Sequence, residues 1–127
     1  MLSDDDREAL ARRNHVFDVI DVAGWAHVTI HEYKLPEGFQ PAVTNLLIKL
    51  PPGFPDAAPD MFWTLPHVTL TRTAAAPPNA DQLEPQSDGQ VWQRFSRHLQ
   101  TPWRPGIDDL DSWLATIEWS LQRDSSA

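Results

Sequence analysis

Ser96 and His98, two residues apart, are the side chains in this chain best suited to nucleophilic chemistry. A serine hydroxyl becomes a nucleophile when a base lies within hydrogen-bond reach and a third group orients that base. Side chains two residues apart share a side only in an extended segment, so a base from elsewhere in the fold, such as His67, serves equally well. The alternative, which the sequence leaves open, is that Ser96 is an ordinary polar loop residue and that His98 packs or caps.

Two arginines and a tryptophan accompany this pair in the stretch from Trp92 to His98. Arg94 and Arg97 form a small basic island in an acidic protein, and guanidinium groups are good partners for carboxylates. We therefore predict that Trp92, Arg94 and Arg97 contact a partner protein. The other interpretation is that both arginines pair with the chain's own abundant acids. Under that interpretation Trp92, like most of the six tryptophans, belongs to the core.

Composition and spacing exclude several other kinds of site. The chain has no cysteine, which rules out disulfides, thiolate zinc sites and a thiol nucleophile. His27 and His31 lie in a segment with strand character, where residues four apart are separated by roughly 13 Å, too far for two ligands of one zinc ion. No glycine-rich phosphate loop is present. We therefore predict neither a cofactor nor a metal.

Charge and hydropathy limit the expected partners and the compartment. The 127 residues carry a formal charge of −8, with a pI near 4.8. Nucleic-acid-binding surfaces are basic, so we expect no nucleic-acid partner. No run of about 18 apolar residues and no signal-peptide core is present, so we expect no membrane segment and a cytoplasmic location.

We expect a helix towards each end of the chain and strands between them. Ser3 can cap a helix whose first turn holds three aspartates and which ends near Arg13. Asp108 or Asp109 can cap a second helix, whose apolar residues recur at helical spacing, with Trp113 widening the stripe: Leu110, Leu114, Ile117 and Leu121. Alternating polar and apolar residues predict a strand at Trp25–Tyr33, antiparallel to a preceding strand at Val16–Val22. We expect two further strands, at Val43–Leu50 and Met61–Thr64.

Two proline-containing segments bracket the part of the chain that we expect to be functional. Leu50–Trp63 holds four of the twelve prolines, so it cannot be a helix or a central strand. We predict a rigid crossing in which Phe54 packs inward. Trp103–Gly106 is the second segment and precedes the last helix. Between them, Thr71–Gly89 has no helical or strand period and is predicted to be a long exposed loop, while Val91–Leu99 stays open between strand and irregular structure.

These elements predict one α+β domain over residues 1–127, with 41% hydrophobic residues to form its core. Its expected order is an N-terminal helix, an antiparallel meander of about four strands, a long loop that carries the candidate site, and a C-terminal helix. We expect residues 123–127 to be a frayed tail.

The two proline segments, Leu50-Pro51-Pro52-Gly53-Phe54-Pro55 with Pro59, and Trp103-Arg104-Pro105, resemble those of the ubiquitin-conjugating enzyme fold. In that family an aromatic-Pro…Pro segment follows the third strand, and a Trp-Ser-Pro starts the second helix. The combination looks most like the bacterial members grouped as prokaryotic ubiquitin-conjugating-like family E, and the similarity runs from Ser3 to about Arg123.

The resemblance also shows where this chain departs from the family. Gly89-Gln90-Val91-Trp92 falls on the family's Gly-x-Ile-Cys active-site stretch, so Trp92 stands where the cysteine would be. The family's His-Pro-Asn has its nearest counterpart in Pro66-His67-Val68, which is reversed in order and lacks the asparagine that assists acyl transfer. Thioester chemistry is therefore impossible in this chain.

By resemblance, the partners would be a ubiquitin-like protein and an ATP-dependent activating enzyme, in a bacterial modification pathway. Two mechanisms stay open. In the first, the domain carries the C-terminus of the ubiquitin-like protein as an oxyester, most plausibly on Ser96 with His98 or His67 as base. In the second, it is a non-catalytic adaptor that binds the ubiquitin-like protein or the activating enzyme. An unrelated small binding domain with a proline-rich loop is a third interpretation, which leaves the paired proline segments unexplained.

Overall fold

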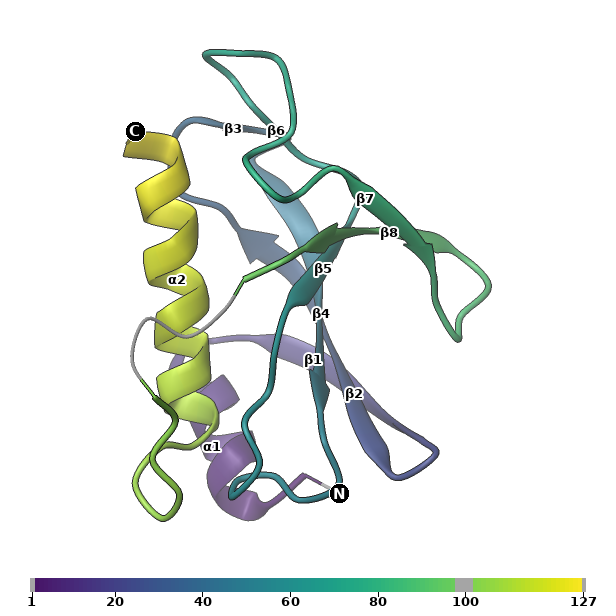
Figure 1. The fold of residues 1–127 in the computed structure, drawn as a ribbon, viewed down its shortest axis with the longest axis vertical. Coiled ribbons are helices and arrows are strands. Elements are labelled where there is room, and N and C mark those ends of the chain that lie inside the picture. The colour runs from purple at the N-terminus through teal and green to yellow at the C-terminus, as the bar shows by residue number, and fades with distance from the viewer. Residues whose placement is uncertain (1, 98–101, 127) are drawn as a thin grey trace.

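The computed structural model describes residues 2–97 and 102–126 and confirms an α+β fold, with a helix towards each end of the chain and an antiparallel sheet between them (Figure 1). The elements in chain order are α1 (Asp4–Arg12), β1 (Val16–Val22), β2 (Trp25–Lys34), β3 (Phe39–Gln40), β4 (Val43–Leu50), β5 (Phe62–Leu65), β6 (Thr69–Leu70), β7 (Gln82–Pro85), β8 (Val91–Phe95) and α2 (Leu110–Ser126).

The main sheet has six strands in the order β1-β2-β4-β5-β8-β7, with every neighbouring pair antiparallel. The four expected strands correspond to β1, β2, β4 and β5, so the expected count of about four is too low. The two additional strands form the β7–β8 hairpin, and β7 lies inside the segment expected to be a loop, Thr71–Gly89. Its residues are mostly exposed and have no period, and pairing with β8 is what makes β7 a strand.

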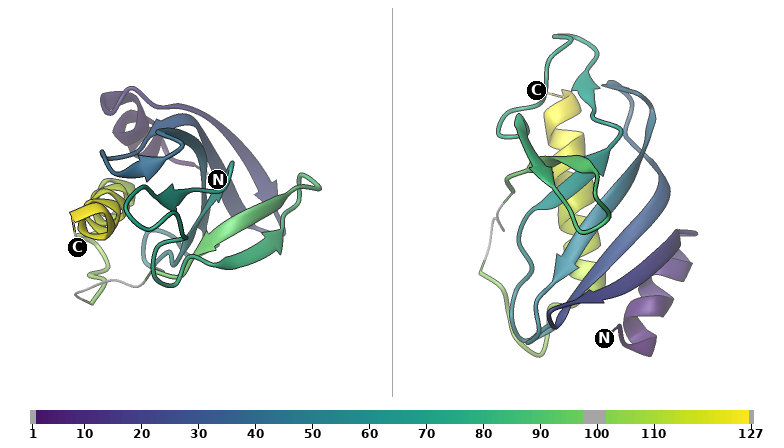
Figure 2. Two further views of the ribbon diagram at one scale, coloured as in Figure 1. Left: turned by 90° about the horizontal axis from the view of Figure 1, so that it is seen from above. Right: turned by 90° about the vertical axis from the view of Figure 1, so that its right-hand side faces the viewer.

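α2 lies across one face of the sheet and buries its apolar stripe there (Figures 1 and 2). Trp113 on α2 is fully buried, and the rings of Phe62 on β5 and Phe95 on β8 stack at 4.7 Å between their centroids. Burying one such side chain contributes about 1.5–3 kcal/mol relative to exposing it. This core fixes α2 against the end of β8, where the candidate site begins.

Both ends of the chain are tied to the rest of the fold. Ser3 caps α1, as the sequence predicts, and it forms a capping box with Asp6. Arg13, just after α1, donates to Glu118 of α2 at 3.0 Å and pairs with Asp111. The expected frayed tail is instead the last turn of α2, at least as far as Ser126. There Arg72 donates to the backbone carbonyls of residues 124 and 125, at 2.8 and 3.0 Å, and so satisfies carbonyls that a helix end leaves without partners.

The two proline segments meet in space. The ring centroids of Phe54 and Trp103 are 6.2 Å apart, and the Trp103 indole N–H donates to the carbonyl of Pro55 at 2.8 Å. Phe54 is half-buried against the core, while Phe62 and Trp63, which follow the crossing, are buried. The predicted rigid crossing is thus held by a contact between segments about fifty residues apart in the chain.

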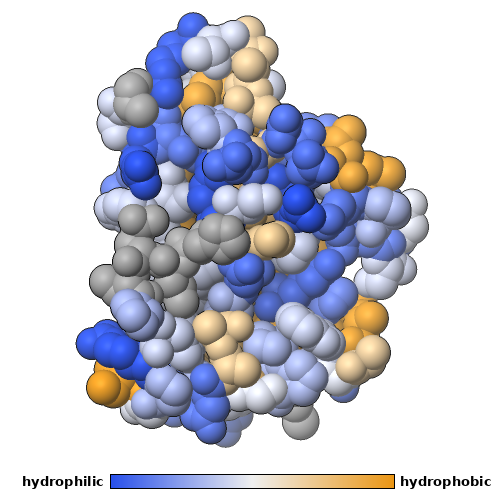
Figure 3. All heavy atoms as spheres, in the orientation of Figure 1, coloured by the Kyte–Doolittle hydropathy of each residue, from blue (hydrophilic) through white to orange (hydrophobic). Residues whose placement is uncertain are grey.

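On the surface seen in Figure 3, apolar residues form small separate patches among hydrophilic ones. Within residues 2–97 and 102–126, neither helix is long and apolar enough to cross a membrane.

Candidate functional site

The candidate site is built around β8, whose side chains alternate between the two faces of the sheet. Gln93 and Phe95 face α2 and the main core. Trp92 lies on the opposite face, in a second, smaller apolar cluster with Leu47 and Trp63. Val91–Leu99, for which the sequence does not decide between strand and irregular structure, thus begins with a strand from Val91 to Phe95.

Trp92, which we expect by resemblance at the family's cysteine position, is only 4% exposed. Its indole N–H donates to Oδ2 of Asp88 at 3.0 Å, across the turn of the β7–β8 hairpin. Burial alone would raise the pKa of Asp88, but hydrogen bonds from the Gln90 backbone and the Trp92 indole outweigh it and lower that pKa. As placed, Trp92 packs inside the chain and offers little surface to a partner.

Arg94 is half-buried beside Trp92. Its guanidinium donates to Oε2 of Glu84 at 2.7 Å, and Oε1 of the same carboxylate accepts from the Trp63 indole at 2.8 Å. The Arg94 Nε atom is buried without a hydrogen-bond partner in the structure. Arg94 thus follows the interpretation in which the basic residues pair with the chain's own acids.

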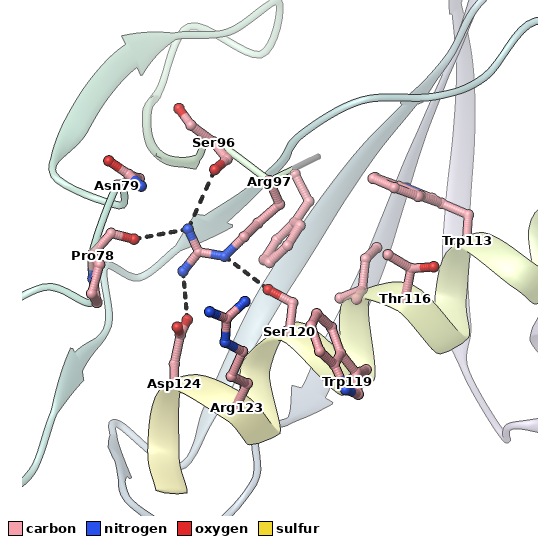
Figure 4. A pocket seen from close by; sticks show the side chains of 12 residues that line it. Pro78, Asn79, Ser96, Arg97, Trp113, Thr116, Trp119, Ser120, Arg123 and Asp124 are labelled. Atoms are coloured by element: carbon pink, nitrogen blue, oxygen red, sulfur yellow. Dashed lines mark hydrogen bonds and ion pairs between the residues drawn. The ribbon is translucent and has the colours of Figure 1, made fainter. Parts of the chain in front are cut away.

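Arg97 extends from the end of β8 to α2, as Figure 4 shows. Its guanidinium donates to Oγ of Ser120 at 2.8 Å, to the carbonyl of Pro78 at 2.8 Å and to Oδ2 of Asp124 at 2.5 Å. The Arg97 and Asp124 side chains are only 13% and 12% exposed. The guanidinium therefore holds three parts of the fold together: the end of β8, the loop before β7 and the last turns of α2.

Ser96 lines a pocket of about 350 Å³ between the end of β8, the loop at Pro78 and Asn79, and α2 (Figure 4). Its backbone N–H donates to the carbonyl of Asn79 at 2.9 Å. The carboxylate that lines this pocket, Asp124, is already paired with Arg97. His98, the expected base, lies outside the described residues.

The structure does not bring His67 to Ser96. The Nε2 atom of His67 is 3.2 Å from the carbonyl oxygen of Val91, at the start of β8. Ser96 follows the other end of that strand, and five extended residues span roughly 16 Å. His67 therefore lies beside the start of β8, far from the candidate nucleophile.

Sequence reasoning missed Gln93, a buried polar residue that joins the site to the loop before β7. Its Oε1 atom accepts from the Thr64 hydroxyl at 2.8 Å and from the Val68 amide at 2.7 Å. Its Nε2 atom donates to the carbonyls of Val68 at 3.0 Å and Ala80 at 2.8 Å. Gln93 is two positions before the apolar Phe95 and therefore shares its face of the strand. A polar residue on a buried face needs hydrogen-bond partners, and this pattern could have identified Gln93 from the sequence.

No group of His, Cys, Asp and Glu side chains among the described residues could hold a metal ion. His27 and His31 lie on β2, the strand expected from the sequence, and His31 pairs with Asp18 on β1, with Nε2 and Oδ2 2.6 Å apart.

Comparison with known proteins gives one match. The family model described as Prokaryotic E2 family E matches residues 2–124, nearly the whole chain. The comparisons with curated proteins and with solved structures found no match.

Proposed function

The chain belongs to prokaryotic E2 family E, where E2 denotes a ubiquitin-conjugating enzyme, and from this we propose that it is an E2-like adaptor. It binds a ubiquitin-like protein or the ATP-dependent enzyme that activates that protein. It holds its partner through non-covalent contacts and does not carry it as a thioester.

The observation that carries this proposal is the state of Trp92. The chain has no cysteine at all, and Trp92, which we expect by resemblance at the family's cysteine position, is 4% exposed. The Trp92 indole is packed against Leu47 and Trp63 and hydrogen-bonded to Asp88. A side chain with this packing stabilises the hairpin, and it leaves no room for an acyl group at that position.

The β7–β8 hairpin offers a surface for the partner. Leu83 on β7 is 56% exposed and Val91 on β8 is 46% exposed, next to the stretch that matches the family's active site. Exposed apolar side chains on a rigid hairpin are suited to protein contact because burying them on binding releases ordered water at little entropic cost to the chain.

A second candidate function is an oxyester carrier with Ser96 as the acyl acceptor. It is supported by the pocket that Ser96 lines, in which a bound acyl group would find room. It needs a base other than His67, which is roughly 16 Å from Ser96 along the strand. His98 is the candidate that the sequence supplies.

One experiment separates the two functions. The protein is mixed with an activating enzyme, ATP and a ubiquitin-like protein from the same organism, and both binding and covalent adducts are measured. The adaptor function predicts binding with no ester adduct. An adduct that survives thiol, is lost in base and disappears in Ser96→Ala would establish the carrier instead, and absence of any binding would refute the adaptor.

Matched surface variants locate the contact. Leu83→Ser should weaken binding by roughly tenfold if Leu83 lies in the interface. Ile107→Ser is the control, because Ile107 is 65% exposed on the loop before α2, in a different part of the chain. Equal effects of the two substitutions would place the contact away from the hairpin.

A further inference from the structure

A second pocket, of about 470 Å³, lies on the sheet face opposite α2. Its walls include the rings of Trp25 and Trp63 and the small side chains of Ala23 and Ala58. Two groups that can react, Lys49 on β4 and His27 on β2, also line it. The pocket is thus mainly apolar, with an amine and an imidazole in its wall.

Lys49 and His27 are directly opposite each other in the antiparallel pairing of β2 and β4. Residues in this position have Cβ atoms about 4.5–5.5 Å apart, on the same face of the sheet. The Lys49 ammonium lies 4.1 Å from the centroid of the Trp63 ring, and His27 is 8% exposed. The strand register therefore places the two side chains next to each other in the wall of one pocket, with the amine over the Trp63 ring.

Burial lowers the pKa of both groups. Burial and then the charge of Lys49 lower the pKa of His27, so its imidazole is neutral at neutral pH. Burial also lowers the pKa of Lys49, although the carboxylate of Glu84 on β7 acts in the opposite direction. Asp60, in the crossing before β5, also lines the pocket. A partly desolvated lysine beside a base is the usual environment of a nucleophilic amine.

From this arrangement we propose that Lys49 is an acyl-accepting amine, which reacts with thioesters whose acyl group enters the pocket, with His27 as the base. The Lys49 Nζ lone pair attacks the carbonyl carbon and forms a C–N bond. His27 accepts the proton that the nitrogen loses. The C–S bond then breaks, and the thiolate leaves with its electron pair and takes the proton from His27. The products are an amide on Lys49 and a thiol, with no oxidation or reduction.

This reaction is chemically distinct from the carrier function, because an amide is stable to both thiol and mild base whereas an oxyester is not. It also needs no serine and no cysteine. The acyl group would then stay on Lys49, because an amide does not pass it on.

The test uses the acetyl thioester of N-acetylcysteamine, and peptide mass spectrometry measures acetylation at each lysine. The chain has a matched control, because its only other lysine, Lys34, is exposed at the end of β2. We expect Lys49 to react roughly 10-fold faster than Lys34 or more, and the rate at Lys49 to level off at a lower pH. His27→Gln, which removes the base and keeps a polar side chain, should bring Lys49 down to the rate of Lys34.

Circular dichroism and thermal unfolding verify that His27→Gln is folded. A rate at Lys49 no greater than at Lys34 in the wild-type protein would overturn the proposal. So would a folded His27→Gln variant that reacts as fast as wild type. The assay needs neither a ubiquitin-like protein nor an activating enzyme, so its outcome is independent of the adaptor function.

Discussion

Replacing Gln93 with leucine tests how the candidate site is held together. The amide of Gln93 satisfies four groups that are fully buried: the Thr64 hydroxyl, the Val68 N–H and the carbonyls of Val68 and Ala80. Leucine has a similar volume, so Gln93→Leu removes the hydrogen bonds with little change in packing. The four groups would then be buried without partners.

The expected cost follows from these four bonds. Each buried polar group that loses its partner costs about 1–3 kcal/mol. The Thr64 hydroxyl can rotate towards another acceptor, and the buried leucine contributes about 1–2 kcal/mol in the opposite direction. We therefore expect Gln93→Leu to lower the free energy of unfolding by about 3–6 kcal/mol. Because a domain of this size is stable by only about 5–15 kcal/mol, the variant should be close to unfolding.

Urea unfolding, followed by tryptophan fluorescence, measures this loss. Gln82→Leu is the matched control, since Gln82 is exposed on β7 and no side-chain hydrogen bond joins it to the described residues. It should change the free energy of unfolding by less than about 0.5 kcal/mol. A loss below about 1 kcal/mol for Gln93→Leu would show that the loop before β7 does not depend on this amide.

Three further predictions address neighbouring features. Arg97→Met leaves the largely buried Asp124 carboxylate without its partner, and should destabilise the protein by about 2–4 kcal/mol in the same urea assay. Arg12→Met is the control and should have almost no effect, because Arg12 is 54% exposed and its partners Glu8 and Asp111 are 66% and 47% exposed. Trp92→Cys introduces the only thiol of the chain at a buried position. A thiol reagent should therefore label this thiol slowly in the native protein and fast in urea, and fast labelling of the native protein would place this position on the surface. Burial lowers the pKa of His15, so the unfolded chain binds a proton there more readily than the folded chain does. The free energy of unfolding should therefore fall as the pH drops below about 6.5. His15→Gln should lessen that fall in unfolding experiments between about pH 5 and 8.

The sequence by itself determined the elements whose signal is local. Alternation of polar and apolar residues predicts a strand at Trp25–Tyr33, and β2 in the structure ends only one residue later, at Lys34. The spacing of Leu110, Leu114, Ile117 and Leu121 gives α2, and Asp109 caps it through the amide of Ser112, at 3.1 Å. These signals are visible because one face of each element must be apolar, whatever it packs against.

β7 could not be predicted from the sequence, because its strand conformation depends on pairing with β8. Gln82–Pro85 has no apolar period, and its backbone is ordered by hydrogen bonds to β8. Pairing between strands depends on register and on neighbours, so a polar edge strand has almost no signature of its own.

The candidate site was decided mostly by tertiary structure. The sequence groups Trp92, Arg94, Ser96 and Arg97 in one short segment. In the fold this segment begins as a strand whose side chains alternate between the two faces of the sheet, with Trp92 on one face and Phe95 on the other. The partner of Arg97 is Asp124, twenty-seven residues away in the sequence, and His27 faces Lys49 from another strand. Composition shows that an acidic chain has many carboxylates to pair with an arginine. Only the fold selects which one, because the selection depends on distances between residues that are remote along the chain.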